Sequence, residues 1–138
     1  MNIFLDTSSL LKLYHREQGT NELIRFISEN AENIYLSEIA KIEFNSAIWK
    51  KVRTKEFAEE KAKQVIAFFE RDFEKFKWIL VKSPIINSAK ELIKQHGNNS
   101  LRTLDAIQLA CAISVKDKIG LFKTSDKVLD RIFDIENL

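Results

Sequence analysis

The chain has 138 residues, of which 45% are hydrophobic and 30% are charged, and this composition is typical of one globular domain with a buried core. The formal net charge of +2 is too small to indicate a nucleic-acid partner by itself, and the only cysteine, Cys111, excludes an intrachain disulfide. We find no secretory leader and no apolar run long enough to span a membrane. We therefore expect a single cytoplasmic domain over residues 1–138, without a membrane anchor.

Short apolar runs alternate with longer helical patterns along the whole chain. Strands are predicted at residues 2–5, 34–36, 78–81 and 120–124. Helices are predicted at 8–14, 20–29, 37–53, 56–75, 84–97 and 103–116, with Ser37 as the N-cap of the third helix and Gly97 as the C-terminal cap of the fifth. A short helix and a possible edge strand at 132–135 close the chain. This alternation predicts an α/β fold with a mainly parallel central sheet.

Four acidic residues occupy apolar settings, where a carboxylate is costly unless it is paired or binds a cation. Asp6 ends the first apolar run, and Asp126 follows the last predicted strand. Glu43 and Asp105 interrupt the apolar faces of two predicted helices. Since sites in open α/β sheets form at the carboxyl ends of strands, these four acids suggest one shared metal site.

Each acid also has a purely structural interpretation. Asp6 and Asp126 each precede a helix and are good N-caps. Glu43 faces the apolar side of its helix but lies at its margin if Trp49 widens that face. Asp105 falls in the first turn of a helix that is apolar nearly all round, where it could pair with Arg102.

Four segments together resemble the motifs of PIN domains, in the same order and with similar spacing. The opening segment, residues 1–8, is similar to the first motif, and residues 101–110 are similar to the third. Glu43, within residues 37–43, resembles the second acid, and Thr124-Ser125-Asp126 resembles the fourth. Gln108 stands where many relatives have another residue, but it leaves the acids intact. The length of the chain is similar to that of VapC-type toxins from toxin–antitoxin pairs.

The resemblance implies a three-layer α/β/α fold and an endoribonuclease that depends on Mg²⁺ or Mn²⁺. It implies that Asp6 and Asp105 contact the metal directly, and that Glu43 and Asp126 complete its shell. Oxygen ligands suit such hard cations, and neither histidine has the spacing of a zinc site. Supporting roles are expected for Thr7, Ser8, Arg102 and Thr124.

The expected partners are an RNA substrate, a small antitoxin and a second copy of the chain. Basic residues at 49–55, with Lys61 and Lys63, either contact RNA phosphates or form an ordinary solvated helix face. Large apolar residues between 44 and 76 either fill the core or form a groove for the antitoxin. Two other functions remain open: a PIN-type nuclease that processes housekeeping RNA or acts on DNA, and a non-catalytic binding module on the same fold.

Overall fold

The computed structural model describes all residues from 1 to 138 and confirms the α/β fold. Four strands form the sheet, namely β1 (Asn2–Leu5), β2 (Asn33–Ser37), β3 (Lys77–Ile79) and β4 (Leu121–Lys123). Seven α-helices cover it: α1 (Thr7–Tyr14), α2 (Thr20–Asn30), α3 (Ala40–Arg53), α4 (Glu59–Arg71), α5 (Ser83–His96), α6 (Thr103–Ser114) and α7 (Lys127–Ile135). None of these helices is long and apolar enough to cross a membrane.

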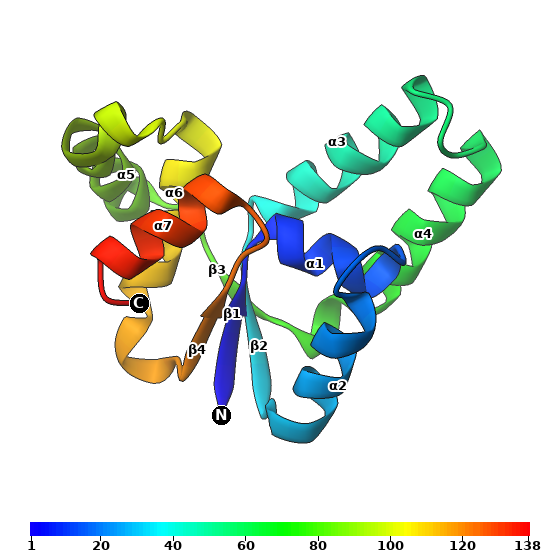
Figure 1. Ribbon diagram of the computed structural model, residues 1–138, viewed down its shortest axis with the longest axis horizontal. Helices are drawn as coiled ribbons and strands as arrows, with labels where there is room; N and C mark the ends of the chain where they lie inside the picture. The colour runs from blue at the N-terminus through cyan, green and yellow to red at the C-terminus, as the bar shows by residue number, and fades with distance from the viewer.

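All strand pairs are parallel, and the order across the sheet is β3-β2-β1-β4. The chain therefore adds β2 and β3 on one side of β1 and then returns to place β4 on the other side (Figure 1). The direction in which strands are added to the sheet therefore reverses between β1 and β4. This is the topological switch point, where open parallel sheets form their binding sites.

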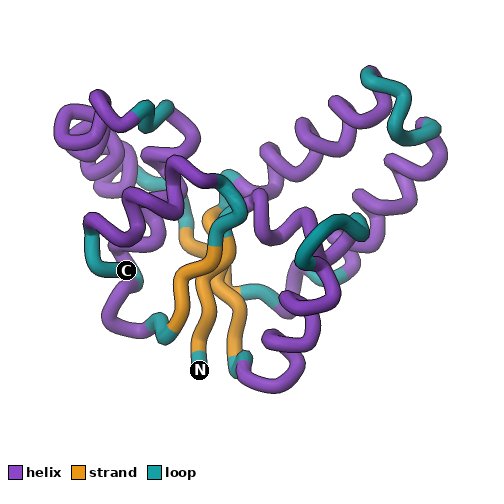
Figure 2. The backbone as a smooth tube through the Cα atoms, viewed as in Figure 1, coloured by secondary structure: helices purple, strands orange, loops and turns teal.

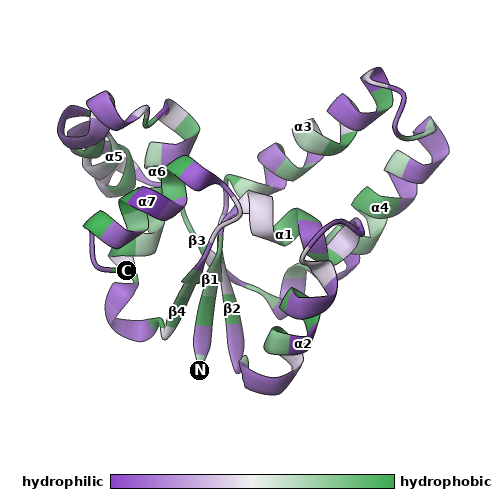
Figure 3. Cartoon of the chain, viewed as in Figure 1, coloured by the Kyte–Doolittle hydropathy of each residue, from purple (hydrophilic) through white to green (hydrophobic).

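The sheet separates two hydrophobic cores, because successive side chains of a strand point to opposite faces. Ile3 and Leu5 pack with α1 to α4, whereas Phe4 between them packs with α5 to α7. Figures 1 and 2 show these two groups of helices on opposite sides of the strands. In Figure 3 the strands carry hydrophobic green segments, and the helices alternate between green and hydrophilic purple along their length. The three-layer α/β/α arrangement expected from the sequence is thus confirmed.

Three local expectations were wrong. Ser37 ends β2 instead of capping a helix, and α3 begins at Ala40. The predicted helix at 56–75 is shorter, because α4 ends at Arg71 and a 3₁₀ turn follows at Phe73–Lys75. The possible edge strand at 132–135 belongs to α7. Gly97 is the C-cap of α5, as expected from the sequence. Its φ of −55° is right-handed and it opens a 3₁₀ turn, which ends at the left-handed Ser100, with φ 66°.

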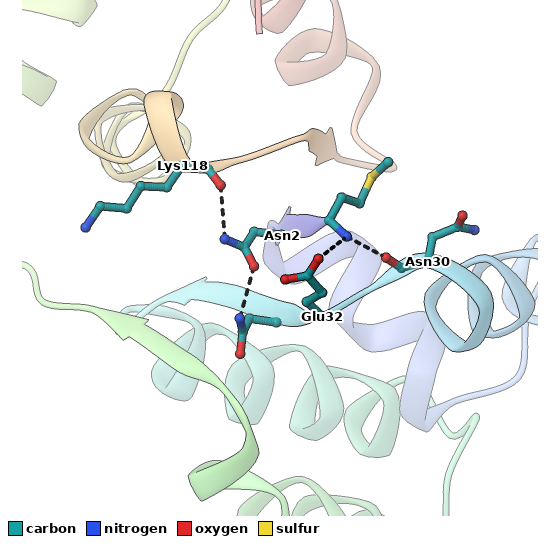
Figure 4. A network of polar contacts seen from close by, with 6 residues as sticks. Asn2, Asn30, Glu32 and Lys118 are labelled. Carbon is teal, nitrogen blue, oxygen red and sulfur yellow. Dashed lines mark hydrogen bonds and ion pairs between the residues drawn. The ribbon is translucent and has the colours of Figure 1, made fainter.

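The amino end of the sheet is held by side-chain amides and the terminal amine (Figure 4). Asn2 donates to the backbone carbonyl of Lys118 at 3.1 Å and accepts from Asn33 at 3.0 Å, so it links β1 to β2 and to the segment before β4. The amine of Met1 donates to the carbonyl of Asn30 at 2.8 Å. These contacts fix one end of the central strand and leave the carboxyl end, at the switch point, for the candidate site.

Candidate active site

The carboxyl ends of β1 and β4 bring two of the four predicted acids to the switch point. Asp6 is the first residue after β1, and Asp126 is the third residue after β4. Each also caps a helix, since Asp6 accepts a hydrogen bond from the amide of Ser9 at 3.1 Å and Asp126 accepts one from the amide of Leu129 at 2.9 Å. The capping interpretation and the site interpretation are therefore compatible in this structure.

Asp6 is held by hydroxyl groups on both of its oxygens. The hydroxyl of Ser8 lies 2.8 and 2.9 Å from the two carboxylate oxygens, and the hydroxyl of Thr124 donates to Oδ2 at 2.6 Å. These donors come from two segments more than a hundred residues apart in the chain. They fix the orientation of the carboxylate before any ligand binds.

The same hydroxyl groups join the loops that follow β1 and β4. The amide of Ser125 donates to the hydroxyl of Ser8 at 2.9 Å, and the amide of Asp126 donates to the hydroxyl of Thr124 at 3.0 Å. The hydroxyls of Ser9 and Ser125 lie 3.2 Å apart. The expected supporting residues Ser8 and Thr124 thus contact Asp6 directly.

Asp6 carries an unfavourable charge in this setting. It is only 4% exposed, and no Lys, Arg or His forms an ion pair with it. Burial raises the pKa of Asp6 to about 6; the hydrogen bonds from Thr124, Ser9 and Ser8 oppose this rise, and the nearby charge of Asp126 adds to it. A cation at this point would relieve the cost of burying the charge.

Asp105 lies in the first turn of α6. It is half-buried, and burial is the main reason why its pKa is raised; the charge of Asp126 raises the pKa further. A hydrogen bond from the backbone of Arg102 and the charge of that residue both lower it. Arg102 is exposed and forms no ion pair with Asp105 within 4.0 Å, so a close structural pair does not account for the acid. The charge of Asp126 acts on Asp6 and Asp105 alike.

Glu43, in the first turn of α3, is fixed by two neutral donors. Its Oε1 accepts from the hydroxyl of Thr7 at 2.8 Å and from Nε2 of Gln108 at 2.7 Å. Nε2 of Gln108 also lies 3.0 Å from the Thr7 hydroxyl, which closes a three-residue network. Glu43 therefore sits at the junction of α1, α3 and α6, again without an ion pair.

Gln108 is the residue of this region for which the sequence analysis predicted no role. It is 3% exposed on α6, and its Oε1 is buried without a hydrogen-bond partner. A polar side chain three residues after Asp105, inside a helix that is otherwise apolar, was the signal that could have marked it. Its observed contact is with Glu43, which it orients.

The chain offers donors for a divalent cation but not a preformed cage. The four acids supply only oxygen atoms and none has a cationic partner, which suits Mg²⁺ or Mn²⁺. No three acidic, histidine or cysteine side chains are placed together to hold a metal. Mg²⁺ commonly takes one or two carboxylates and completes its shell with water, so this donor set fits such a cation.

The expected groove of large apolar residues is mostly core. Phe44 and Phe69 are fully buried, Phe57 and Phe76 are 5% and 9% exposed, and only Phe68 of the predicted phenylalanines is clearly exposed, at 43%. These rings pack on one another, with Phe44 and Phe69 at 4.3 Å between centroids. A groove built on this whole set was therefore the wrong expectation.

Comparisons with known proteins agree with the geometry. The sequence profile of the PIN domain matches residues 3–134, whereas no curated protein sequence matches significantly. Among solved structures, VapC20 from Mycobacterium tuberculosis, described as a toxin that cleaves the sarcin–ricin loop, has a TM-score of 0.72 at 17% identity, covering 94% of each chain.

Two further similar structures are complexes. FitAcB from Neisseria gonorrhoeae has a TM-score of 0.73 at 14% identity, covering 96% of this chain and 93% of that chain. VapBC2 from Rickettsia felis, bound to a DNA fragment from its promoter, has a TM-score of 0.66 at 15% identity, covering 95% and 92%. At these identities, the structural likeness establishes the fold.

Proposed function

Because the chain belongs to the PIN-domain family, we propose that it is a metal-dependent endoribonuclease and the toxin of a toxin–antitoxin pair. PIN domains are nucleases that generally use divalent cations. The observation that carries the proposal is Asp6, a buried carboxylate at the switch point with oriented oxygens and no cationic partner. A binding module would have no need of such an arrangement.

The hydrogen bonds around Asp6 and Glu43 support the following roles. Asp6 and Asp105 would hold Mg²⁺ or Mn²⁺, and Glu43 and Asp126 would complete its shell directly or through water. Ser8 and Thr124 keep the Asp6 oxygens in place, and Thr7 and Gln108 do the same for Glu43. Such a cation, when bound, would activate water for attack and stabilise the charge that develops on the phosphate.

The direct test is cleavage of RNA pools by the pure protein with Mg²⁺ or Mn²⁺, beside the Asp6→Asn variant and a chelated sample. The proposal expects cleavage by the wild type with metal only, restored when metal is added back after chelation. Cleavage that persists in chelator and in Asp6→Asn would contradict the mechanism. Preference for DNA over RNA would favour the alternative nuclease function.

A small antitoxin is the proposed protein partner, in line with the solved complexes of similar fold. The acids lack a cation, so a basic side chain of the partner could occupy the metal position and block it. Co-expression with the product of a small adjacent reading frame tests this: a stable complex without nuclease activity supports it. A chain that binds no such product and leaves growth unaffected favours a housekeeping nuclease.

Self-association into a homodimer is also proposed, because several large apolar side chains remain exposed outside the core. Ile86 is 47% exposed beside a small apolar pocket between α5 and α6. The mass in solution, measured by light scattering, decides between one and two copies.

A further inference from the structure

One face of α3 connects Glu43 to two basic residues. Ser46, Ala47, Lys50 and Arg53 follow Glu43 by three, four, seven and ten residues, so they share its side of the helix. Together with Ile39, Ile42 and Leu104 they line a groove of about 330 Å³, which we call the α3 groove. The groove therefore opens directly onto one of the candidate site acids.

The two basic residues of the α3 groove are free of ion pairs. Lys50 and Arg53 are exposed and no carboxylate lies within 4.0 Å of either. By contrast, Lys51 on another face of α3 pairs with Glu56 at 3.2 Å. The basic cluster predicted from the sequence is thus divided: Lys51 has a local structural partner, whereas Lys50 and Arg53 are available to an anion.

The groove also exposes apolar side chains next to two of the acids in the sequence. Ile42 is 72% exposed, and Leu104 of α6, next to Asp105, is 47% exposed. A ligand with alternating anionic and flat apolar parts matches this surface. An unpaired nucleic-acid strand has both, because its phosphates are charged and its bases are free to lie on apolar side chains.

We propose that the α3 groove binds an unpaired segment of the substrate RNA, with Lys50 and Arg53 on its phosphates and bases against Ile42 and Leu104; this inference rests on the proposed nuclease function. Along the helix axis, Lys50 and Arg53 lie about 10 and 15 Å from Glu43. That length corresponds to about three to four stacked nucleotides, at roughly 3.4 Å each. A paired helix hides its bases, so the surface selects single-stranded regions.

The binding test compares two double variants with equal loss of charge, both in an Asp6→Asn background that prevents cleavage. Lys50→Ala with Arg53→Ala removes the groove cations, whereas Lys51→Ala with Lys63→Ala removes two lysines that pair with Glu56 and Glu59. Binding of a fluorescein-labelled unpaired RNA oligonucleotide is followed by anisotropy over a range of salt concentrations. A hairpin duplex of the same length is the second probe.

The groove double variant should bind the unpaired oligonucleotide roughly tenfold more weakly, since each exposed contact contributes at most about 1 kcal/mol. Its plot of log K against log salt should be shallower by about 1.4, because each phosphate contact to a single strand contributes about 0.7. The control variant should keep both the affinity and the slope. In the wild-type background, the groove variant should show a higher KM for cleavage with little change in kcat.

Equal affinities and slopes in the two double variants would overturn the groove assignment while leaving the nuclease proposal intact. Tighter binding of the duplex than of the unpaired strand would also overturn it. A groove variant that changes the mass of the protein in solution would assign this face to an interface between copies instead. If the chain without these substitutions binds and cleaves none of the RNAs, the proposed function itself fails, and the groove proposal fails with it.

Discussion

Asp6 and Asp72 are two aspartates largely removed from solvent, and their surroundings differ in charge. Asp72 follows α4 and accepts a hydrogen bond from the Tyr14 hydroxyl at 2.7 Å, with Lys75 at 3.2 Å and Arg71 at 3.8 Å. Burial raises the pKa of Asp72, but these three neighbours outweigh burial and hold it below its usual value. Asp6 has only neutral donors, and its pKa is raised to about 6.

The contrast separates an acid whose charge is compensated within the fold from one that we propose binds a cation. Asp72 ties α1 to α4 beside the aromatic core and is compensated within the chain. Asp6 is just as firmly oriented but its charge is left uncompensated. Both acids are oriented by hydrogen bonds, so orientation does not distinguish them, but the uncompensated charge does. Buried acids with a raised pKa cluster at functional sites.

The largest expected effect is on catalysis. Asp6→Asn keeps the shape of the side chain but removes the charge proposed to hold the cation, so RNA cleavage should fall by about 10³-fold or more. Asp72→Ala should cleave normally at a temperature where it is folded. Single-turnover cleavage assays with saturating metal measure both, and an equal loss in the two variants would abolish the distinction.

A smaller effect concerns stability against pH without metal. Because the pKa of Asp6 is higher in the folded chain (about 6) than its reference value of 3.8, the folded state binds the extra proton between these two values. The free energy of unfolding should therefore decrease as pH rises through that window and level off above it, by on the order of 2–3 kcal/mol.

Thermal unfolding in chelator at several pH values measures this decrease. Asp6→Asn should flatten the dependence, and Mg²⁺ or Mn²⁺ should restore stability to the wild type near neutral pH more than to the variant. A wild-type stability that rises steadily from pH about 4 to about 7 would contradict the assignment.

Removing the compensated acid, Asp72, should lower the stability of the fold. Asp72→Ala leaves the part-buried Tyr14 hydroxyl without its acceptor and removes two cation contacts, so the free energy of unfolding should fall by about 1–2 kcal/mol. Denaturant titration at neutral pH measures this. Pairing the change with Tyr14→Phe should recover part of the loss, because the unsatisfied hydroxyl is then gone.

The smallest expected effect is at Asp105. Asp105→Asn relieves repulsion from Asp126 in the metal-free protein, but the residue is only half-buried, so the gain should stay below about 1 kcal/mol. The melting temperature in chelator should rise slightly, and added metal should shift it less than in the wild type. Equal metal-induced shifts would argue against a site shared with Asp6.

Much of this arrangement could be predicted because local pattern and burial agree. The apolar run before Asp6 forms β1, and the almost entirely apolar segment around Asp105 forms the buried helix α6. Local pattern was not sufficient at residues 132–135, because a short apolar run fits a strand or a helix equally well. In the structure this run is the last part of α7.

Contacts between distant segments were beyond prediction from the sequence. Nothing local to Gln108 indicates that it meets Glu43 sixty-five residues away. Likewise, the sequence of the six phenylalanines and one tryptophan between residues 44 and 76 does not show whether they fill a core or line a groove. Whether these rings are buried depends on the packing of α3 and α4 against α1. The sequence also does not distinguish Lys50 from Lys51. They lie on different faces of α3, so Lys51 pairs with Glu56 whereas Lys50 lines the α3 groove.

The hydrogen bond from Thr124 to Asp6 has a consequence for the protein during its own synthesis. Its two residues are 118 positions apart, so Asp6 leaves the ribosome long before the strand that completes its surroundings. Strand β1 can pair with β2 early, but its other neighbour, β4, arrives after six helices have been made. A nascent chain therefore carries an incomplete site, and any nuclease activity begins only once residues 121–126 have folded onto β1.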